Sequence, residues 1–81
     1  MENADTINYY QRDVYGQSSY FKHNITKNYA LKINVNPVRI SKNKAPTFLA
    51  EQSSIIGTMI KIPKKKFERI LSEAKQELNT L

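Results

Sequence analysis

The chain has 81 residues, with 13 Lys and Arg against 7 Asp and Glu, and therefore a formal net charge of +6. It contains no cysteine and a single histidine, His23. These counts exclude disulfides, thiolate metal sites, cysteine nucleophiles and a metal centre built from several histidines of one chain. A chain of this length buries only about 60% of the surface that its unfolded form exposes, so we expect a binding partner to supply additional stability.

Charged and aromatic residues are distributed unequally along the chain. The first 30 residues hold three basic and three acidic residues, whereas the remainder holds ten basic and four acidic ones. Six of the eight aromatic residues lie in the first part. This asymmetry predicts two segments, an aromatic arm at residues 1–29 and a small basic module at residues 30–81.

The segment of residues 1–29 shows neither the 3.6-residue period of a helix nor the alternation of a strand. Asn, Gln, Ser, Gly and Asp lie between its tyrosines, and these residues favour turns over regular structure. Ile7, Val14 and Ile25 are its only large aliphatic residues, too few to form a core. We therefore expect an extended arm, with one helical turn near residues 5–12.

A half-buried strand is predicted next, because Leu31, Ile33 and Val35 alternate with polar residues. Pro37 has no N–H group to donate to a central ladder, so residues 38–40 are expected to form an edge strand.

A basic loop at residues 41–46 (SKNKAP) and a short helical turn at residues 47–52 are expected to follow. The helical turn would direct Phe48 and Leu49 toward the core.

The clearest pattern is a strand followed by a helix. Residues 53–62 are rich in β-branched side chains, which suit a pleated surface, and Pro63 ends this strand. Apolar residues at positions 67, 70, 71, 74 and 78 then predict an amphipathic helix of about four turns. The predicted fold is α+β, with two or three antiparallel strands and one C-terminal helix after the extended N-terminal arm. The expected core comprises Ile33, Val35, Ile56, Ile60, Ile62, Phe67, Ile70, Leu71 and Leu78.

The predicted helix has its charges reversed, with three lysines at residues 64–66 and with Glu73 and Glu77 in its last two turns. A helix N-terminus carries about half a positive charge, so each lysine there costs on the order of 0.3 kcal/mol. One interpretation is a solvated run that keeps the sheet edge soluble. The other is an anion site formed by free helix N–H groups and three ammonium groups. The second interpretation predicts a patch of charged contacts: Arg39, Lys42, Lys44, Lys64, Lys65 and Lys66.

Several classes of function are not expected. The acidic residues form no pair around a substrate, and the two glycines form no phosphate-binding loop, so we expect no enzyme, no metal and no cofactor. No stretch approaches the roughly 18 apolar residues of a bilayer-spanning helix, so membrane insertion is not expected. The first residues are typical of neither a secretory signal nor a transit peptide, which favours a cytosol-like compartment.

Two classes of partner remain open. Clustered lysines suit sequence-tolerant binding of nucleic acid, as in a DNA-binding or ribosome-associated protein, with tyrosines stacking on bases. They equally suit an acidic protein assembly, in which the chain would be a subunit of a hetero-complex and the arm would supply aromatic anchors. The expected anchors are Tyr9, Tyr10, Tyr15, Tyr20 and Phe21.

The order of elements over residues 30–78 resembles that of the small linker polypeptides of phycobilisomes, the rod- or core-capping kind. In that family a strand ending in Val-Pro-Tyr leads into a helix. Here Ile62 and Pro63 match the first two positions, whereas Lys64 stands in place of the tyrosine, and the family's Gly-Gly-Lys-Ile strand after the helix does not follow. The resemblance implies a basic, chromophore-free linker seated in an acidic phycobiliprotein ring, at the stromal or cytoplasmic face of the thylakoid.

Overall fold

The computed structural model describes residues 4–35, 37–53 and 59–79. The segment predicted to be an arm forms a β-hairpin instead. Strands β1 (Ile7–Val14) and β2 (Gln17–Asn24) pair antiparallel over their full length. Tyr15 and Gly16 join them with φ angles of 52° and 78°. Two successive residues with positive φ form the type I′ turn, whose twist matches that of the paired strands.

The prediction of an extended arm and of a helical turn near residues 5–12 is therefore wrong, and the reason lies in the position of the hairpin. Both its strands are inner strands of the sheet, and helices pack on both sheet faces. Tyr9 and Tyr20 point toward one face, whereas Tyr10 and Phe21 point toward the other. A strand with apolar contacts on both faces loses the alternation by which strands are recognised in a sequence.

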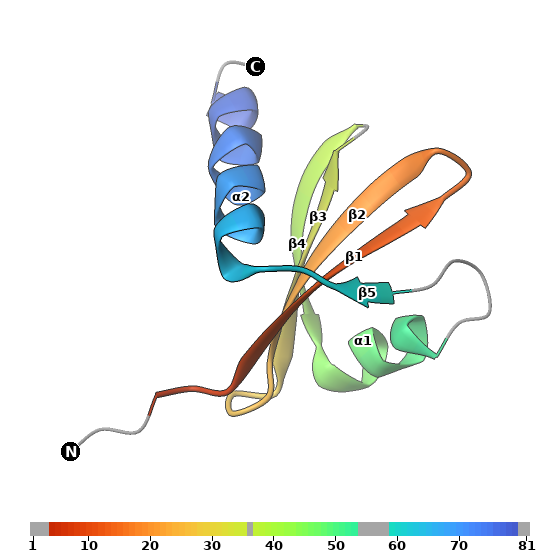
Figure 1. The fold of residues 1–81 in the computed structure, drawn as a ribbon, viewed down its shortest axis with the longest axis vertical. Helices are drawn as coiled ribbons and strands as arrows, with labels where there is room; N and C mark the ends of the chain where they lie inside the picture. Colours follow the sequence, from red (N-terminus) through yellow and green to blue (C-terminus); the bar gives the residue numbers. More distant parts are fainter. Residues whose placement is uncertain (1–3, 36, 54–58, 80–81) are drawn as a thin grey trace.

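The remaining elements complete an α+β fold (Figure 1). Over the described residues, five strands form one antiparallel sheet in the order β4-β3-β2-β1-β5, more strands than the two or three predicted. β2 pairs with β3 across the predicted boundary between arm and module. The other elements are β3 (Tyr29–Val35), β4 (Val38–Lys44), α1 (Ala45–Gln52), β5 (Met59–Lys61) and α2 (Lys64–Asn79).

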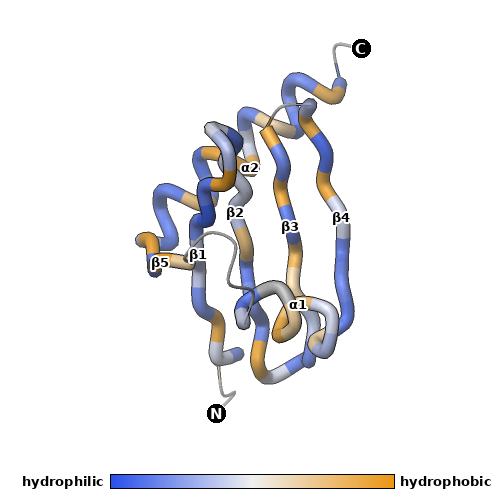
Figure 2. Tube along the Cα trace, turned by 90° about the vertical axis from the view of Figure 1, so that its right-hand side faces the viewer, coloured by the Kyte–Doolittle hydropathy of each residue, from blue (hydrophilic) through white to orange (hydrophobic). Residues whose placement is uncertain are grey.

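The two helices lie on opposite faces of the sheet (Figure 2). The face toward α2 holds the larger cluster of buried residues: Tyr20, Ile33, Phe67, Ile70 and Ala74. The face toward α1 holds a smaller cluster of Phe21, Ala30 and Phe48. Each cluster is therefore a thin layer between the sheet and one helix.

The predicted core is confirmed for Ile33, Phe67 and Ile70, which are buried, and Ile62 and Leu71 pack against them while partly exposed. Three predicted core residues are instead exposed: Val35, Ile60 and Leu78, with exposed fractions of 39%, 53% and 38%. Val35 and Leu78 lie at the ends of their elements and Ile60 lies on the edge strand, where coverage is incomplete. Ile56 lies outside the described residues.

The other predicted elements have mixed outcomes. The edge strand at residues 38–40 is confirmed, but it continues through the predicted basic loop to Lys44. α1 begins at Ala45 and is longer than the predicted turn. The helix after Pro63 is confirmed as α2. Of the strand predicted at residues 53–62, residues 59–61 form β5, Ser53 lies in a turn after α1, and residues 54–58 lie outside the described residues.

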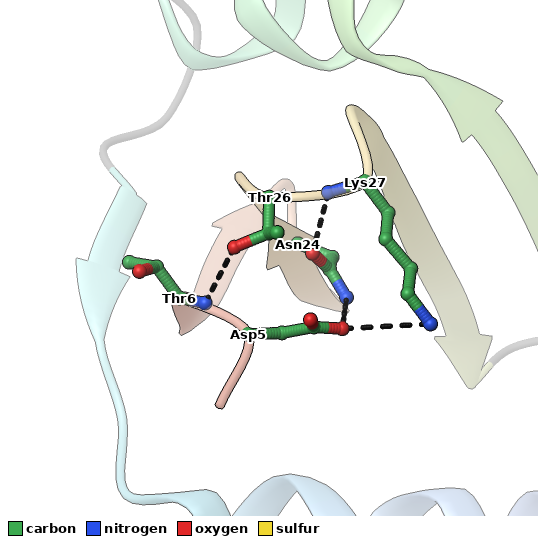
Figure 3. Close-up of polar contacts among 5 residues, drawn as sticks. All are labelled: Asp5, Thr6, Asn24, Thr26 and Lys27. Carbon is green, nitrogen blue, oxygen red and sulfur yellow. Dashed lines mark hydrogen bonds and ion pairs between the residues drawn. The ribbon is translucent and has the colours of Figure 1, made fainter. Parts of the chain in front are cut away.

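A network of hydrogen bonds fastens the start of the chain to the turn between β2 and β3 (Figure 3). The side chain of Asn24 is buried, donates to Asp5 Oδ2 at 3.1 Å and accepts from the Lys27 backbone N–H at 2.9 Å. The Thr6 N–H donates to Thr26 Oγ1 at 2.8 Å, and Lys27 Nζ lies 3.6 Å from Asp5. These contacts satisfy the polar groups of Asn24 that burial removes from water.

Candidate functional site

One end of the sheet face toward α1 is open. The α1 helix packs over β3 and β4 near the turn between β2 and β3, and its first N–H donates to the Asn28 carbonyl at 3.3 Å. Figure 2 shows that α1 crosses this face near that end, so the opposite ends of the strands extend beyond it. The open end is bordered by the turn between β1 and β2 at Tyr15 and Gly16.

A groove runs over this open end, and we call it the basic groove. Its larger part has a volume of about 490 Å³ and is lined by Arg12, Val14, Tyr15, Gln17, Ser19, Lys32 and Asn34. A smaller part of about 200 Å³ is lined by Gln17, Ser18, Ser19, Asn34, Val35, Pro37 and Arg39. Gln17, Ser19 and Asn34 line both parts, so the two parts adjoin at β2 and β3.

Three cations from three different strands belong to this groove. Arg12 comes from β1, Lys32 from β3 and Arg39 from β4. The Arg12 guanidinium and the Lys32 ammonium each lie 5.6 Å from the centroid of the Phe21 ring, within the range of cation–π attraction. One buried aromatic ring therefore holds two positive charges at the floor of the groove.

The register of the strands also keeps carboxylates away from the floor of the groove. Successive side chains of a strand point to opposite faces, so Asp13 faces the other side from Arg12. There the Ser18 hydroxyl and the Gln11 amide donate hydrogen bonds to Asp13 and hold the pKa of its carboxyl below the ordinary value. Among the described strand residues, none that faces the groove is Asp or Glu.

Neutral polar groups fill the space between the cations. The Ser19 hydroxyl donates to Asn34 Oδ1 at 2.8 Å, which orients the Asn34 amide. Gln17 is exposed beside it, at the start of β2. The Tyr15 ring at the rim has an exposed fraction of 93%, far above that of any other aromatic residue in the described ranges. The groove therefore presents positive charge, amides, a hydroxyl group and one accessible ring.

The predicted patch of six basic residues is not assembled at one place. Arg39 lies in the basic groove, but Lys42 is on the opposite face of β4, where its ammonium lies 4.5 Å from the Tyr29 ring centroid. Lys44 is two residues further along the same strand and so shares the face of Lys42.

The lysines at residues 64–66 begin α2, beside β1 and β5 rather than β4. Lys66 Nζ donates to Gln11 Oε1 at 2.8 Å, and Lys64 lies 4.0 Å from Glu68. These contacts offset part of the cost of placing basic residues at a helix N-terminus. The solvated and the anion-binding interpretations of this run both remain predictions.

Most of the predicted aromatic anchors have structural roles. Tyr20 and Phe21 are buried in the two clusters. Tyr9 packs on Phe67 with ring centroids 5.3 Å apart, and Tyr10 packs on Phe48 at 5.9 Å. Tyr15 is the predicted anchor that remains accessible.

Sequence reasoning missed most of the residues that line the groove. The sequence pattern assigns Arg12 and Gln17 to an extended arm, and Lys32 and Asn34 to the polar side of a strand. The signal that was available is Gly16, a turn residue between two eight-residue segments. A hairpin placed there aligns Arg12 with Ser19, and pairing with β3 aligns Ser19 with Asn34.

No cluster of three or more His, Asp or Glu among residues 4–35, 37–53 and 59–79 is suited to hold a metal ion. His23 packs on Phe48 with ring centroids 4.5 Å apart, and burial lowers its pKa. No helix in those same ranges is long and apolar enough to cross a membrane.

Comparison with known proteins gives no guide to the site. No family model, no curated protein and no solved structure matches this chain.

Proposed function

We propose that the protein is a non-catalytic nucleic-acid-binding module that contacts its ligand through the basic groove. The observation that supports this most is the arrangement of Arg12, Lys32 and Arg39 on one face of three strands, around neutral hydrogen-bonding side chains. The net charge of +6 favours association with any polyanion.

The groove has the two kinds of group that nucleic-acid recognition uses. Lys and Arg neutralise phosphates and release condensed counterions, which supplies most of the affinity of sequence-tolerant binding. Amide and hydroxyl groups such as those of Gln17, Ser19 and Asn34 contact phosphate oxygens, sugars and base edges. The exposed Tyr15 ring at the rim adds a surface on which a base can stack.

An acidic protein assembly is a weaker candidate, because it depended on aromatic anchors. Tyr20 and Phe21 are buried, and Tyr9 and Tyr10 are engaged in the packing of the helices, so inserting them into a partner would require unfolding. The resemblance to phycobilisome linkers, which rests on the order of elements over residues 30–78, stays a prediction.

The test is binding of fluorescein-labelled single-stranded DNA and RNA, about 12 nucleotides long, measured by fluorescence anisotropy at several salt concentrations. In the double variant Lys32→Gln/Arg39→Gln we expect at least a tenfold loss of affinity at low salt. The slope of log K against log salt should fall by about 1.4, because two contacts to single-strand phosphates are lost.

The matched control is Lys65→Gln/Lys75→Gln, which removes the same charge from exposed positions of α2 on the other side of the sheet. In this control we expect the affinity to fall at most threefold, because only the net charge of the protein changes. An equal or larger loss in the control would place the contact surface on α2 and contradict the proposal. If the wild-type protein binds neither nucleic acid at low salt, an acidic protein becomes the partner class to test.

A further inference from the structure

The aromatic residue at the rim of the groove occupies a backbone position that disfavours it. Tyr15 is the first of the two turn residues and has a φ of 52°. Bulky residues rarely adopt this left-handed conformation, whereas Asn and Gly adopt it at little cost, which is why Asn-Gly dominates type I′ turns. The chain therefore has a tyrosine where asparagine would stabilise the hairpin.

The structure shows no compensation for this cost through packing. With 93% of its surface exposed, Tyr15 buries almost no apolar area. The other aromatic residues of the hairpin are partly or fully buried against Phe67 or Phe48. A strained residue that contributes little to folding is a candidate for function.

The place of Tyr15 connects this observation with the basic groove. Tyr15 lines the larger part of the groove together with Arg12 and Lys32. The turn between β1 and β2 lies at the end of the hairpin away from α1 (Figure 1), and from this turn Tyr15 lines the rim of the groove. A nucleotide whose phosphate is bound at the cations would have its base near this rim.

We infer that the ligand of the groove is single-stranded nucleic acid and that Tyr15 stacks on an unpaired base. This inference rests on the proposed function, because it assigns the phosphates of the same ligand to Arg12, Lys32 and Arg39. A duplex would not offer the face of a base to a ring at the rim, since its bases are stacked on one another. Base–aromatic stacking is tolerant of sequence, as is the binding of phosphates by the cations of the groove.

Three chains and three probes test the inference: the wild type, Tyr15→Asn and Tyr15→Phe, each with a single strand, a duplex and an abasic single strand of equal length. In Tyr15→Asn we expect the melting temperature to rise by about 3 °C, because asparagine fits the turn. We expect its affinity for the normal single strand to fall at least fivefold. Its affinity for the abasic strand should not change. Tyr15→Phe should retain wild-type binding, since the ring is kept.

The remaining outcomes separate the inference from the proposed function. If Tyr15→Asn binds the normal strand as tightly as the wild type does, stacking is refuted while phosphate binding by the groove stands. If Tyr15→Asn weakens binding of the abasic strand equally, the residue acts through the shape of the groove and the inference is wrong. Tighter binding of the duplex than of the single strand also overturns it. If the wild type binds none of the three probes, the proposed function itself fails.

Discussion

The two halves of the sheet face toward α1 are built from the same strands, yet they differ in chemistry. In the half beneath α1, Phe21, Ala30 and Phe48 are fully buried. In the half beyond α1, the strands present Arg12, Lys32 and neutral polar groups. Phe21 lies at the boundary, because its ring is near both Phe48 and the two cations.

The length of α1 explains this division. A helix of eight residues is about 12 Å long, whereas strands of seven or eight residues extend about 25 Å. This short helix therefore covers only part of the face, and the fully buried strand residues Phe21 and Ala30 lie where it packs. The open half is therefore a polar and basic surface rather than part of the hydrophobic core.

The largest loss of stability is expected in the half of the face beneath α1, the covered half. Phe48→Ala removes a fully buried ring that packs on Tyr10, Phe21 and His23. We expect the free energy of unfolding to fall by about 3–5 kcal/mol, which would leave this small domain largely unfolded. Chemical denaturation followed by circular dichroism measures the change. Leu49→Ala, at the neighbouring and half-exposed position, is the control and should cost less than about 1 kcal/mol. Similar losses in both variants would refute a packed layer under α1.

A smaller loss of stability is expected at the turn between β2 and β3, at the end of the sheet that α1 covers. Asn24→Ala removes a buried donor to Asp5 and a buried acceptor for the Lys27 N–H. The Asp5 carboxylate and the Lys27 N–H then lose their part-buried partner, and such a loss costs about 1–3 kcal/mol. Thermal unfolding measures this loss of stability. Thr26→Val is the comparison and should cost less, because the hydrogen bond that Thr26 accepts from the Thr6 N–H is exposed to solvent. If Asn24→Ala is as stable as the wild type, the network of Figure 3 has no energetic role.

The covered half should also respond to pH through His23, whose pKa is lowered by burial. The unfolded chain binds a proton first as the pH falls through about 6.5, so stability present above that value decreases toward the lower folded pKa. We expect a lower melting temperature at about pH 5.5 than at about pH 7.5, and His23→Gln should remove this part of the dependence. Asp5 and Asp13, whose pKa values are also lowered, lose their contribution only in stronger acid. A melting temperature that rises on mild acidification would contradict the burial of His23.

The smallest effect on stability is expected in the open half. Arg39→Gln changes an exposed residue near two other cations, so the free energy of unfolding should stay within about 0.5 kcal/mol of the wild type or rise slightly. The same denaturation experiment measures it. A loss above about 1 kcal/mol would mean that the open half is structural, and the contrast between the two halves would disappear.

The sequence was sufficient for elements that have their own periodicity and insufficient for those that depend on tertiary contacts. Leu31 and Ile33 alternate with polar residues, and Phe67 and Ile70 follow helical spacing, so β3 and α2 were predicted correctly. Tyr9, Tyr10, Tyr20 and Phe21 have no such pattern, because adjacent residues are buried against different helices.

Residue type alone was enough to identify some members of the basic groove, but not those that strand pairing brings together. Arg39 was identified by its charge and Tyr15 by its ring, and both line the basic groove. Grouping Arg39 with Lys42 in one patch was wrong, because two residues three positions apart on a strand point to opposite faces of the sheet. Bringing Arg12 and Lys32 together requires the register of β1, β2 and β3, which depends on the position of the turn at Gly16.

The most direct test of the open half as a binding surface is an NMR titration of the labelled protein with a single-stranded oligonucleotide. We expect the largest chemical-shift changes in residues of the basic groove: Arg12, Tyr15, Gln17, Ser19, Lys32, Asn34 and Arg39. The amides of α2, on the other side of the sheet, should change little. Changes centred on residues 64–66, or an absence of changes at ligand excess, would contradict it.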